Sequence, residues 1–174
     1  MALAAKNELS LDRIIIVPTG QAPHKPDISA SPRHRAEMCR VLCEKYGFKL
    51  SLYEVEKEGN CYTADLLKYF AALYPEDEFY LIMGADSMDY MDKWYKPERI
   101  FPRCTVAVAR RRGAGDGKAE FLTKNFGAKI DFLSCEYFDV SSTEIRKALL
   151  SGDNISGLID EETAEYIRRN NLYR

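Results

Sequence analysis

The sequence predicts an α/β fold with a doubly wound, mostly parallel sheet of Rossmann-like architecture. Short apolar and β-branched runs alternate along the chain with longer segments that show helical periodicity. The short runs are apolar on both faces, which is typical of strands covered by helices on each side of a parallel sheet. The chain has 174 residues, of which 46% are hydrophobic and 30% are charged. Residues 1–174 are therefore expected to form a single domain with an ordinary core.

Local signals give the order of the elements. Ser31 followed by Pro32 predicts a helix start, and Gly47 predicts the end of that helix. Ser141 and Glu144 fit a capping box. The expected elements are, in order, a helix over 1–12, a strand over 13–17, a helix over 32–46, a strand over 48–55, a helix over 66–74, strands over 79–83 and 105–109, a weak helix over 121–126, a strand over 129–133, and two helices over about 143–150 and 161–169 within the C-terminal region 141–170.

The composition excludes several classes of protein. Lysine and arginine number 25 against 27 acidic residues, which argues against a large nucleic-acid surface. No apolar run is long enough to span a membrane. The five cysteines form no C-x-x-C pair, so reduced thiols in a cytoplasmic protein are expected, and neither a disulfide framework nor a zinc site. The two histidines lie on different elements and predict no metal site.

Three segments directly follow predicted strands, where ligands bind in parallel sheets. The first, Pro18 to Lys25, places the cation Lys25 in position for a phosphate, unless the segment is only a crossover loop. Asp86 follows the strand over 79–83, and it either begins a helix or accepts hydrogen bonds from ribose hydroxyls. The third segment, Arg110–Arg112, is either a solvated face or a source of positive field.

Two further motifs allow both a structural and a functional interpretation. The hydroxyls and free N–H groups over 141–143 can hold phosphate at a helix start, and Arg146 could reach the same anion. The capping box alone would also explain this segment. A single tryptophan usually belongs to a core, but Trp94 lies among charged residues, so an exposed stacking face is the alternative.

Taken together, these segments resemble the bacterial nicotinate-mononucleotide adenylyltransferases, of the nucleotidyltransferase α/β-phosphodiesterase superfamily, whose fold is adenine nucleotide α-hydrolase-like. The resemblance extends over nearly the whole chain, and the order and spacing of its motifs make it specific. It is carried by IIIVPTGQAPHK (14–25), HRAEM (34–38), CYTADLL (61–67), GADS (84–87), Trp94-Tyr95, VSSTEIR (140–146), Tyr166-Ile167 and Leu172-Tyr173.

The resemblance implies adenylyl transfer from ATP to nicotinate mononucleotide with Mg²⁺, giving the deamido dinucleotide and pyrophosphate. These two small molecules are then the expected partners, without nucleic acid or membrane, and a homo-oligomer is left open. In the family pattern the nicotinate ring is held by Thr63, Trp94 and Tyr95, and Asp86 lies beside the nucleotide sugar. The implied phosphate-binding residues are Lys25, Ser142, Thr143 and Arg146.

One part of the family pattern has no counterpart in this sequence. Members open with a strand, a G-G-T-F-D-P-x-H-x-G-H loop and a helix, and Met1 corresponds to a position inside that helix. The first strand and both signature histidines are therefore missing, and no catalytic residue is assigned in this chain. We expect about 20 further residues in the gene product. Residues 1–174 alone are expected to be poorly stable and nearly inactive, because the missing strand belongs at the centre of the sheet.

Two alternatives stay open on the sequence alone. Phosphopantetheine adenylyltransferase shares the fold and a similar S-S-T-x-x-R segment, although Trp94-Tyr95 and the C-Y-T segment favour the nicotinate enzymes. A degenerate, non-catalytic nucleotide-binding module would explain the missing histidines. The DNA upstream of Met1 distinguishes this second alternative, because an in-frame glycine-rich segment would indicate the enzyme.

Overall fold

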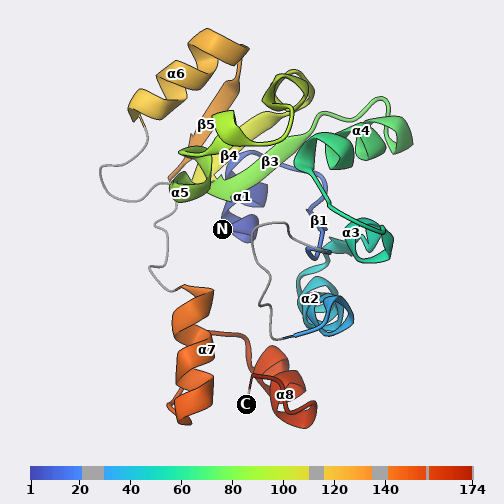
Figure 1. The fold of residues 1–174 in the computed structure, drawn as a ribbon, viewed down its shortest axis with the longest axis vertical. Coiled ribbons are helices and arrows are strands. Elements are labelled where there is room, and N and C mark those ends of the chain that lie inside the picture. Colours follow the sequence, from blue (N-terminus) through green and yellow to red (C-terminus); the bar gives the residue numbers. More distant parts are fainter. Residues whose placement is uncertain (21–29, 110–115, 135–140, 156, 174) are drawn as a thin grey trace. The chain divides into compact units, whose positions relative to one another are not determined.

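A computed structural model describes residues 1–20, 30–109, 116–134, 141–155 and 157–173 (Figure 1). The elements in chain order are α1 (Ala2–Glu8), β1 (Ile15–Ile16), α2 (Pro32–Tyr46), β2 (Lys49–Leu50), α3 (Tyr53–Glu56), α4 (Thr63–Leu73), β3 (Tyr80–Gly84), α5 (Ala85–Met88), β4 (Thr105–Ala109), α6 (Asp116–Phe126), β5 (Lys129–Leu133), α7 (Ser142–Ser151) and α8 (Glu161–Arg169). Short 3₁₀ turns at Met91–Lys93, Pro97–Arg99 and Phe101–Arg103 connect α5 to β4.

The described strands are all parallel to their neighbours. β3, β4 and β5 lie side by side in this order, so that Tyr80 pairs with Thr105 and Thr105 pairs with Lys129. β1 pairs with β2 in a second parallel sheet. The predicted α/β class with parallel strands is confirmed, although the strands in the described part of the chain pair in two sheets and not in one.

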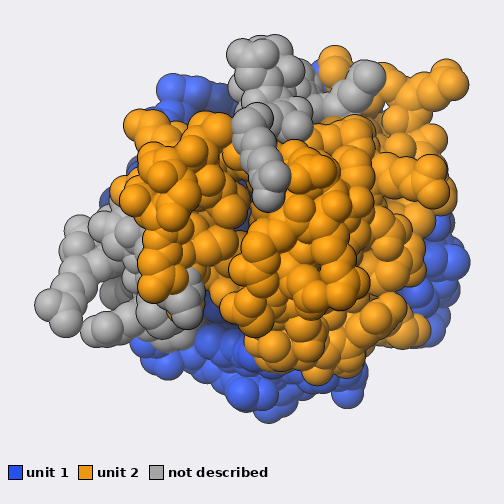
Figure 2. Space-filling model, turned by 90° about the horizontal axis from the view of Figure 1, so that it is seen from below, with its two compact units in different colours: residues 1–12, 62–137 blue, residues 13–61, 138–174 orange. Residues whose placement is uncertain are grey.

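The chain divides into two compact units, which Figure 2 colours separately. Unit 1 consists of residues 1–12 and 62–137, and unit 2 consists of residues 13–61 and 138–174. Unit 1 therefore contains the sheet β3-β4-β5 with α1, α4, α5 and α6, whereas unit 2 contains β1 and β2 with α2, α3, α7 and α8. That residues 1–174 act as one domain stays a prediction.

Strand β4 is the centre of unit 1 because both of its faces are buried. Val106 and Val108 are fully buried in a cluster that includes Leu122 of α6. Successive side chains of a strand point to opposite faces, and Ala107 accordingly belongs to a second cluster with Ala5 of α1. Helices thus cover both faces of this sheet, as the apolar strands predict.

Helix α1 approaches the sheet closely because the contacting side chains are small. Ala5 is fully buried against Ala107 and Ala109. At the end of the helix, the Glu8 carboxylate accepts hydrogen bonds from the N–H of Ser134 at 2.9 Å and from its hydroxyl at 2.8 Å. These contacts join the predicted N-terminal helix to the carboxyl end of β5.

The boundaries of α2 follow from the signals that predict them. The Ser31 hydroxyl accepts a hydrogen bond from the His34 N–H at 3.3 Å, and Pro32 is the first helical residue. The helix ends at Gly47, whose φ of 65° lies in the left-handed region that glycine adopts without strain.

Helices α2 and α8 are joined by polar contacts within unit 2. Lys45 Nζ lies 2.5 Å from a carboxylate oxygen of Asp160, the N-cap residue of α8. The bond from Lys45 lowers the pKa of Asp160. His34 Nδ1 lies 2.9 Å from the Tyr166 hydroxyl. His34 therefore serves to hold α8 against α2.

The expected strand over 48–55 is wrong beyond its beginning. β2 spans Lys49–Leu50, and Tyr53–Glu56 forms helix α3. The ladder ends where the Ser51 N–H bonds to Ile16 O, because Pro18 has no N–H with which to extend β1.

None of the described helices is both long and apolar enough to cross a lipid bilayer.

Candidate functional site

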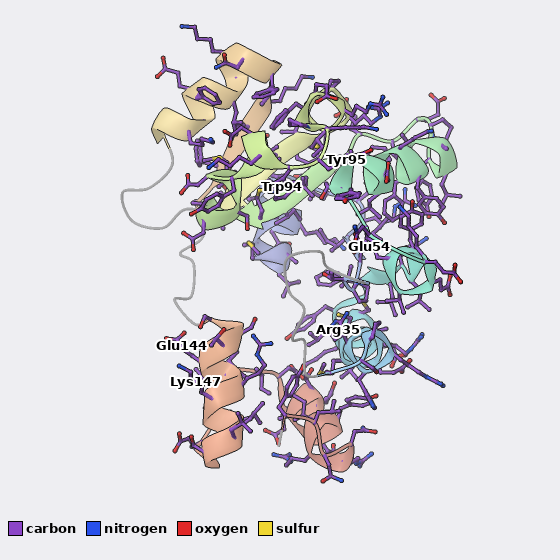
Figure 3. All side chains as sticks on the ribbon, viewed as in Figure 1. Arg35, Glu54, Trp94, Tyr95, Glu144 and Lys147 are labelled. Atoms are coloured by element: carbon purple, nitrogen blue, oxygen red, sulfur yellow. The ribbon has the colours of Figure 1, made fainter. Side chains whose placement is uncertain are left out.

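An aromatic group in unit 1 brings together the residues expected to hold a nicotinate ring. Tyr95 is 41% exposed, and its ring stacks on that of Tyr62 with 4.2 Å between centroids and 28° between planes. Thr63 follows Tyr62 directly and is the first residue of α4. Figure 3 shows Tyr95 beside the start of this helix. Trp94 is half-buried and packs against the core cluster, so its indole is part of the core and also partly accessible.

The start of α4 offers backbone donors that no side chain occupies. Its N-cap residue Tyr62 makes no side-chain capping bond. The N–H groups of Asp65 and Leu66 bond to Tyr62 O. Within the described part of the chain, the N–H groups of Thr63 and Ala64 have no partner. Such unpaired donors at a helix start suit an anion.

The three expected phosphate ligands of the C-terminal region lie together at the start of α7. The predicted capping box is present: Ser141 Oγ accepts from the Glu144 N–H at 3.2 Å, and a Glu144 carboxylate oxygen accepts from the Ser141 N–H at 2.7 Å. Arg146 turns back over the first turn, where its Nε donates to Ser142 O at 3.0 Å and its guanidinium reaches Thr143 Oγ1 at 3.4 Å. The structural interpretation of this segment is therefore correct, and the Arg146 guanidinium also lies beside the Thr143 hydroxyl.

The carboxyl end of β1 is fixed by two side chains of unit 2. Arg35 donates to Thr19 O at 2.6 Å, to Gly20 O at 2.8 Å and to Ala30 O at 2.5 Å. The Gly20 N–H donates to a carboxylate oxygen of Glu54 at 3.3 Å. Arg35 and Glu54, both labelled in Figure 3, thereby hold the ends of the segment that contains Lys25.

Glu54 is held in an unfavourable environment for a carboxylate. Burial raises its pKa, and the bond from Gly20 and the charge of Lys57 oppose this shift only in part. The Cys61 thiol also lies 3.5 Å from Glu54 O. The backbone of Gly20 packs tightly against both residues, since a Cβ at this position would lie 1.9 Å from Glu54 O and 3.3 Å from Cys61 Sγ.

The remaining expected site residues have different outcomes. Asp86 is exposed in the first turn of α5, directly after β3, as expected for a group at the carboxyl end of a strand. Lys25 and Arg110–Arg112 lie outside the described residues. Thr63 and Tyr95 are brought together in unit 1, and Ser142, Thr143 and Arg146 are brought together in unit 2.

The sequence interpretation missed Tyr62, Arg35 and Glu54. Tyr62 and Arg35 each lie inside a motif that carries the resemblance, C-Y-T and H-R-A-E-M, but neither was singled out. Glu54 has no local signal, since its partner Gly20 lies 34 residues away in the chain.

Comparison with known proteins identifies the family. The sequence profile of the cytidylyltransferase-like family matches residues 1–148. A Shewanella frigidimarina protein named "Probable nicotinate-nucleotide adenylyltransferase" is 34% identical, over 99% of this chain and 90% of its own length. The chain belongs to the nicotinate-nucleotide adenylyltransferase family. A relative of the same name from Clostridium novyi is 33% identical over 100% of this chain and 90% of its own. These relatives confirm the resemblance and do not favour a phosphopantetheine enzyme.

Solved structures agree with the fold of this adenylyltransferase. Plasmodium falciparum nicotinic acid mononucleotide adenylyltransferase complexed with NaAD matches with a TM-score of 0.74 at 22% identity, covering 98% of this chain and 88% of that one. The same enzyme complexed with APC matches with a TM-score of 0.72 over the same fractions. The likeness supports the nucleotidyltransferase fold.

Gly20→Ala should destabilise the adenylyltransferase, because a Cβ at this position would lie 1.9 Å from Glu54 O. We expect the free energy of unfolding to fall by about 1–3 kcal/mol, the usual cost of overpacking. Gly117→Ala is the control, since a Cβ at Gly117 in α6 meets nothing within 4 Å. That variant should gain up to about 1 kcal/mol of helix propensity. Urea unfolding measures the stability of both variants. Equal midpoints for Gly20→Ala and the parent would contradict the close packing of Gly20 against Glu54.

The stability of Glu54→Gln relative to the parent protein should increase as the pH rises from about 4 to 7. Because burial raises the folded pKa of Glu54, the native state binds more protons than the unfolded state over this range. The contribution of Glu54 to stability is therefore full below its unfolded pKa of about 4.3 and is lost as the pH rises through the folded pKa. Glutamine keeps an oxygen for the Gly20 N–H without this loss.

Urea unfolding at several pH values tests the effect of Glu54→Gln. Glu56→Gln is the matched control, because it removes a carboxylate from the exposed side of the same helix α3. A stability difference between parent and Glu54→Gln that does not change with pH would contradict the prediction.

Proposed function

We propose that this adenylyltransferase joins ATP and nicotinate mononucleotide in the cytoplasm, giving the deamido dinucleotide and pyrophosphate. The supporting observation is that the Tyr62–Tyr95 stack holds Tyr95 beside the uncapped start of α4, in a chain that belongs to this family. The four described cysteines are free thiols, which suits a reducing compartment.

The nicotinate half of the substrate would bind at Thr63, Trp94 and Tyr95. The accessible part of the Trp94 indole offers a face for the cationic pyridine ring, through stacking and cation–π attraction. The nicotinate carboxylate would accept hydrogen bonds from the Thr63 N–H and Ala64 N–H, which have no partner among the described residues. The indole would therefore recognise the planar cationic ring, and the N–H groups would recognise the carboxylate.

The ATP half would use the other candidate residues. Ser142, Thr143 and Arg146 would hold phosphate oxygens, and Lys25 would add positive charge. Asp86 would accept hydrogen bonds from the hydroxyls of the nucleotide sugar.

Mg²⁺ would enter this site as part of the substrate MgATP. In the described part of the chain, no three His, Cys, Asp or Glu side chains form a set that could hold a metal ion. Mg²⁺ commonly binds through substrate phosphates with one or two carboxylates.

The reaction requires positioning and no covalent enzyme intermediate. A phosphate oxygen of the mononucleotide attacks the α-phosphorus of ATP, and the bond to the β-phosphate breaks as pyrophosphate leaves. The contribution of the protein is to align these groups and to stabilise negative charge as it develops. Backbone donors and the Arg146 guanidinium are suited to this task.

The full natural protein should prefer nicotinate mononucleotide to nicotinamide mononucleotide. At a site of backbone donors the carboxylate is accepted, whereas the amide NH₂ of nicotinamide would place a donor against a donor. An unmatched buried donor costs about 1–3 kcal/mol, which corresponds to a factor of about 5 to 150 in kcat/KM. Pyrophosphate release with each mononucleotide measures the ratio, and equal values of kcat/KM would refute the proposed specificity.

Arg146→Ala should raise the KM for ATP or lower kcat by about tenfold, because a charge-assisted hydrogen bond to phosphate is lost. Arg146→Lys should recover only part of the activity, since lysine has no planar fork. Lys147→Ala removes one exposed positive charge from the same helix and is the control. Thermal melting should show an intact fold in all three variants. Full activity of Arg146→Ala would exclude Arg146 from the site.

A further inference from the structure

Tyr62 makes a specific contact that its position in the helix does not require. It is the N-cap residue of α4, where serine, threonine, aspartate or asparagine would supply a capping oxygen. Its side chain instead stacks on Tyr95, with ring centroids 4.2 Å apart and planes 28° apart. This contact joins two segments that lie more than thirty residues apart in the chain, and both carry expected nicotinate-binding residues.

The segment that follows Tyr95 is under backbone strain. Lys96 has φ 51° and ψ 59°, a left-handed conformation that is uncommon for any residue other than glycine. It also precedes Pro97, and a following proline disfavours helical conformations of its neighbour. Strained backbone of this kind persists where surrounding contacts hold it in place.

Several contacts hold this segment. Lys96 Nζ lies 4.5 Å from the centre of the Tyr95 ring. Asp92 forms an ion pair with Lys118 of α6 at 2.5 Å, and Trp94 packs against the core. The stack of Tyr95 on Tyr62 is a further contact, and it connects the segment to the start of α4.

We propose that Tyr62 is a positioning residue that sets the preference for the nicotinate mononucleotide. By stacking on Tyr95, it fixes the main chain of Trp94 and Tyr95 beside the N–H groups of Thr63 and Ala64. The inference rests on the proposed function, since it concerns the mononucleotide half of that site. Tyr62 itself need not touch the substrate.

Loss of the Tyr62–Tyr95 stack should affect the binding of nicotinate mononucleotide and not that of ATP. When the stack is lost, the Trp94-Tyr95 segment is free to relax from the strained conformation at Lys96, and the indole and the helix start no longer hold a fixed geometry. Affinity for nicotinate mononucleotide and discrimination against the nicotinamide form should both fall. The KM for ATP should stay unchanged.

The test compares Tyr62→Leu, which removes the ring, with Tyr62→Phe, which keeps it. Tyr69→Leu is the matched control, because Tyr69 is a 40% exposed tyrosine on the same helix. Trp94 is the only tryptophan of the chain, so its fluorescence and its quenching by acrylamide report on this segment without any substrate. Kinetics with both mononucleotides and with ATP supply the second measurement.

We expect Tyr62→Leu to make Trp94 more accessible to acrylamide, to raise the KM for nicotinate mononucleotide about three- to tenfold, and to leave the KM for ATP unchanged. Tyr62→Phe and Tyr69→Leu should behave like the parent. Unchanged Trp94 quenching in Tyr62→Leu, or an equal rise of KM for both substrates, would overturn the inference.

Two additions keep the test decisive. If Tyr62→Leu does not fold, Tyr95→Leu breaks the same stack from the other side and should expose Trp94 to acrylamide in the same way, whereas unchanged quenching would count against the inference. Failure of the proposed function is recognised separately, since the unchanged natural protein would then fail to use nicotinate mononucleotide. The substrate-free quenching result does not depend on that outcome.

Discussion

Burial of β4 on both faces is the constraint on which unit 1 depends. A strand that presents valines on one face and alanines on the other needs a different helix to cover each face. Val106 and Val108 pack with α6, and Ala107 admits α1 so closely that Ala5 has no exposed surface. Because β3 pairs in register along the whole of β4, its carboxyl end is fixed as well. Asp86 and the turn that leads to Trp94 therefore begin from a rigid position.

The helix starts of this protein show where local stability gives way to another demand. α2, α7 and α8 begin with side-chain caps from Ser31, Ser141 and Asp160, each of a type that contributes about 0.5–2 kcal/mol. α4 has no such cap. A serine at position 62 could cap the helix, but it would remove the ring that stacks on Tyr95. The tyrosine thus exchanges a local stabilising bond for a contact between distant segments.

Local signals in the sequence predicted the elements well, and contacts between distant residues account for what it missed. The strands at 105–109 and 129–133 have the predicted limits, because a β-branched or alternating run fixes each one. The helix Tyr53–Glu56 was missed because the end of β1, and not the local pattern, limits β2. Within the site, the grouping of Ser142, Thr143 and Arg146 followed from helical spacing.

The end of β1 shows most clearly that a site can be supported at the expense of stability. Gly20 is held from two directions, since its N–H donates to Glu54 and its C=O accepts from Arg35. Both supports have a cost: the Glu54 carboxylate is partly desolvated, which raises its pKa, and the buried Arg35 Nε has no partner among the described residues. An apolar contact would avoid both penalties. Such penalties concentrate where a backbone position matters for function, and Arg35 also binds Ala30 O, at the other end of the segment that carries Lys25. Contacts from α2 and α3, distant in the chain from Gly20, therefore determine where both ends lie.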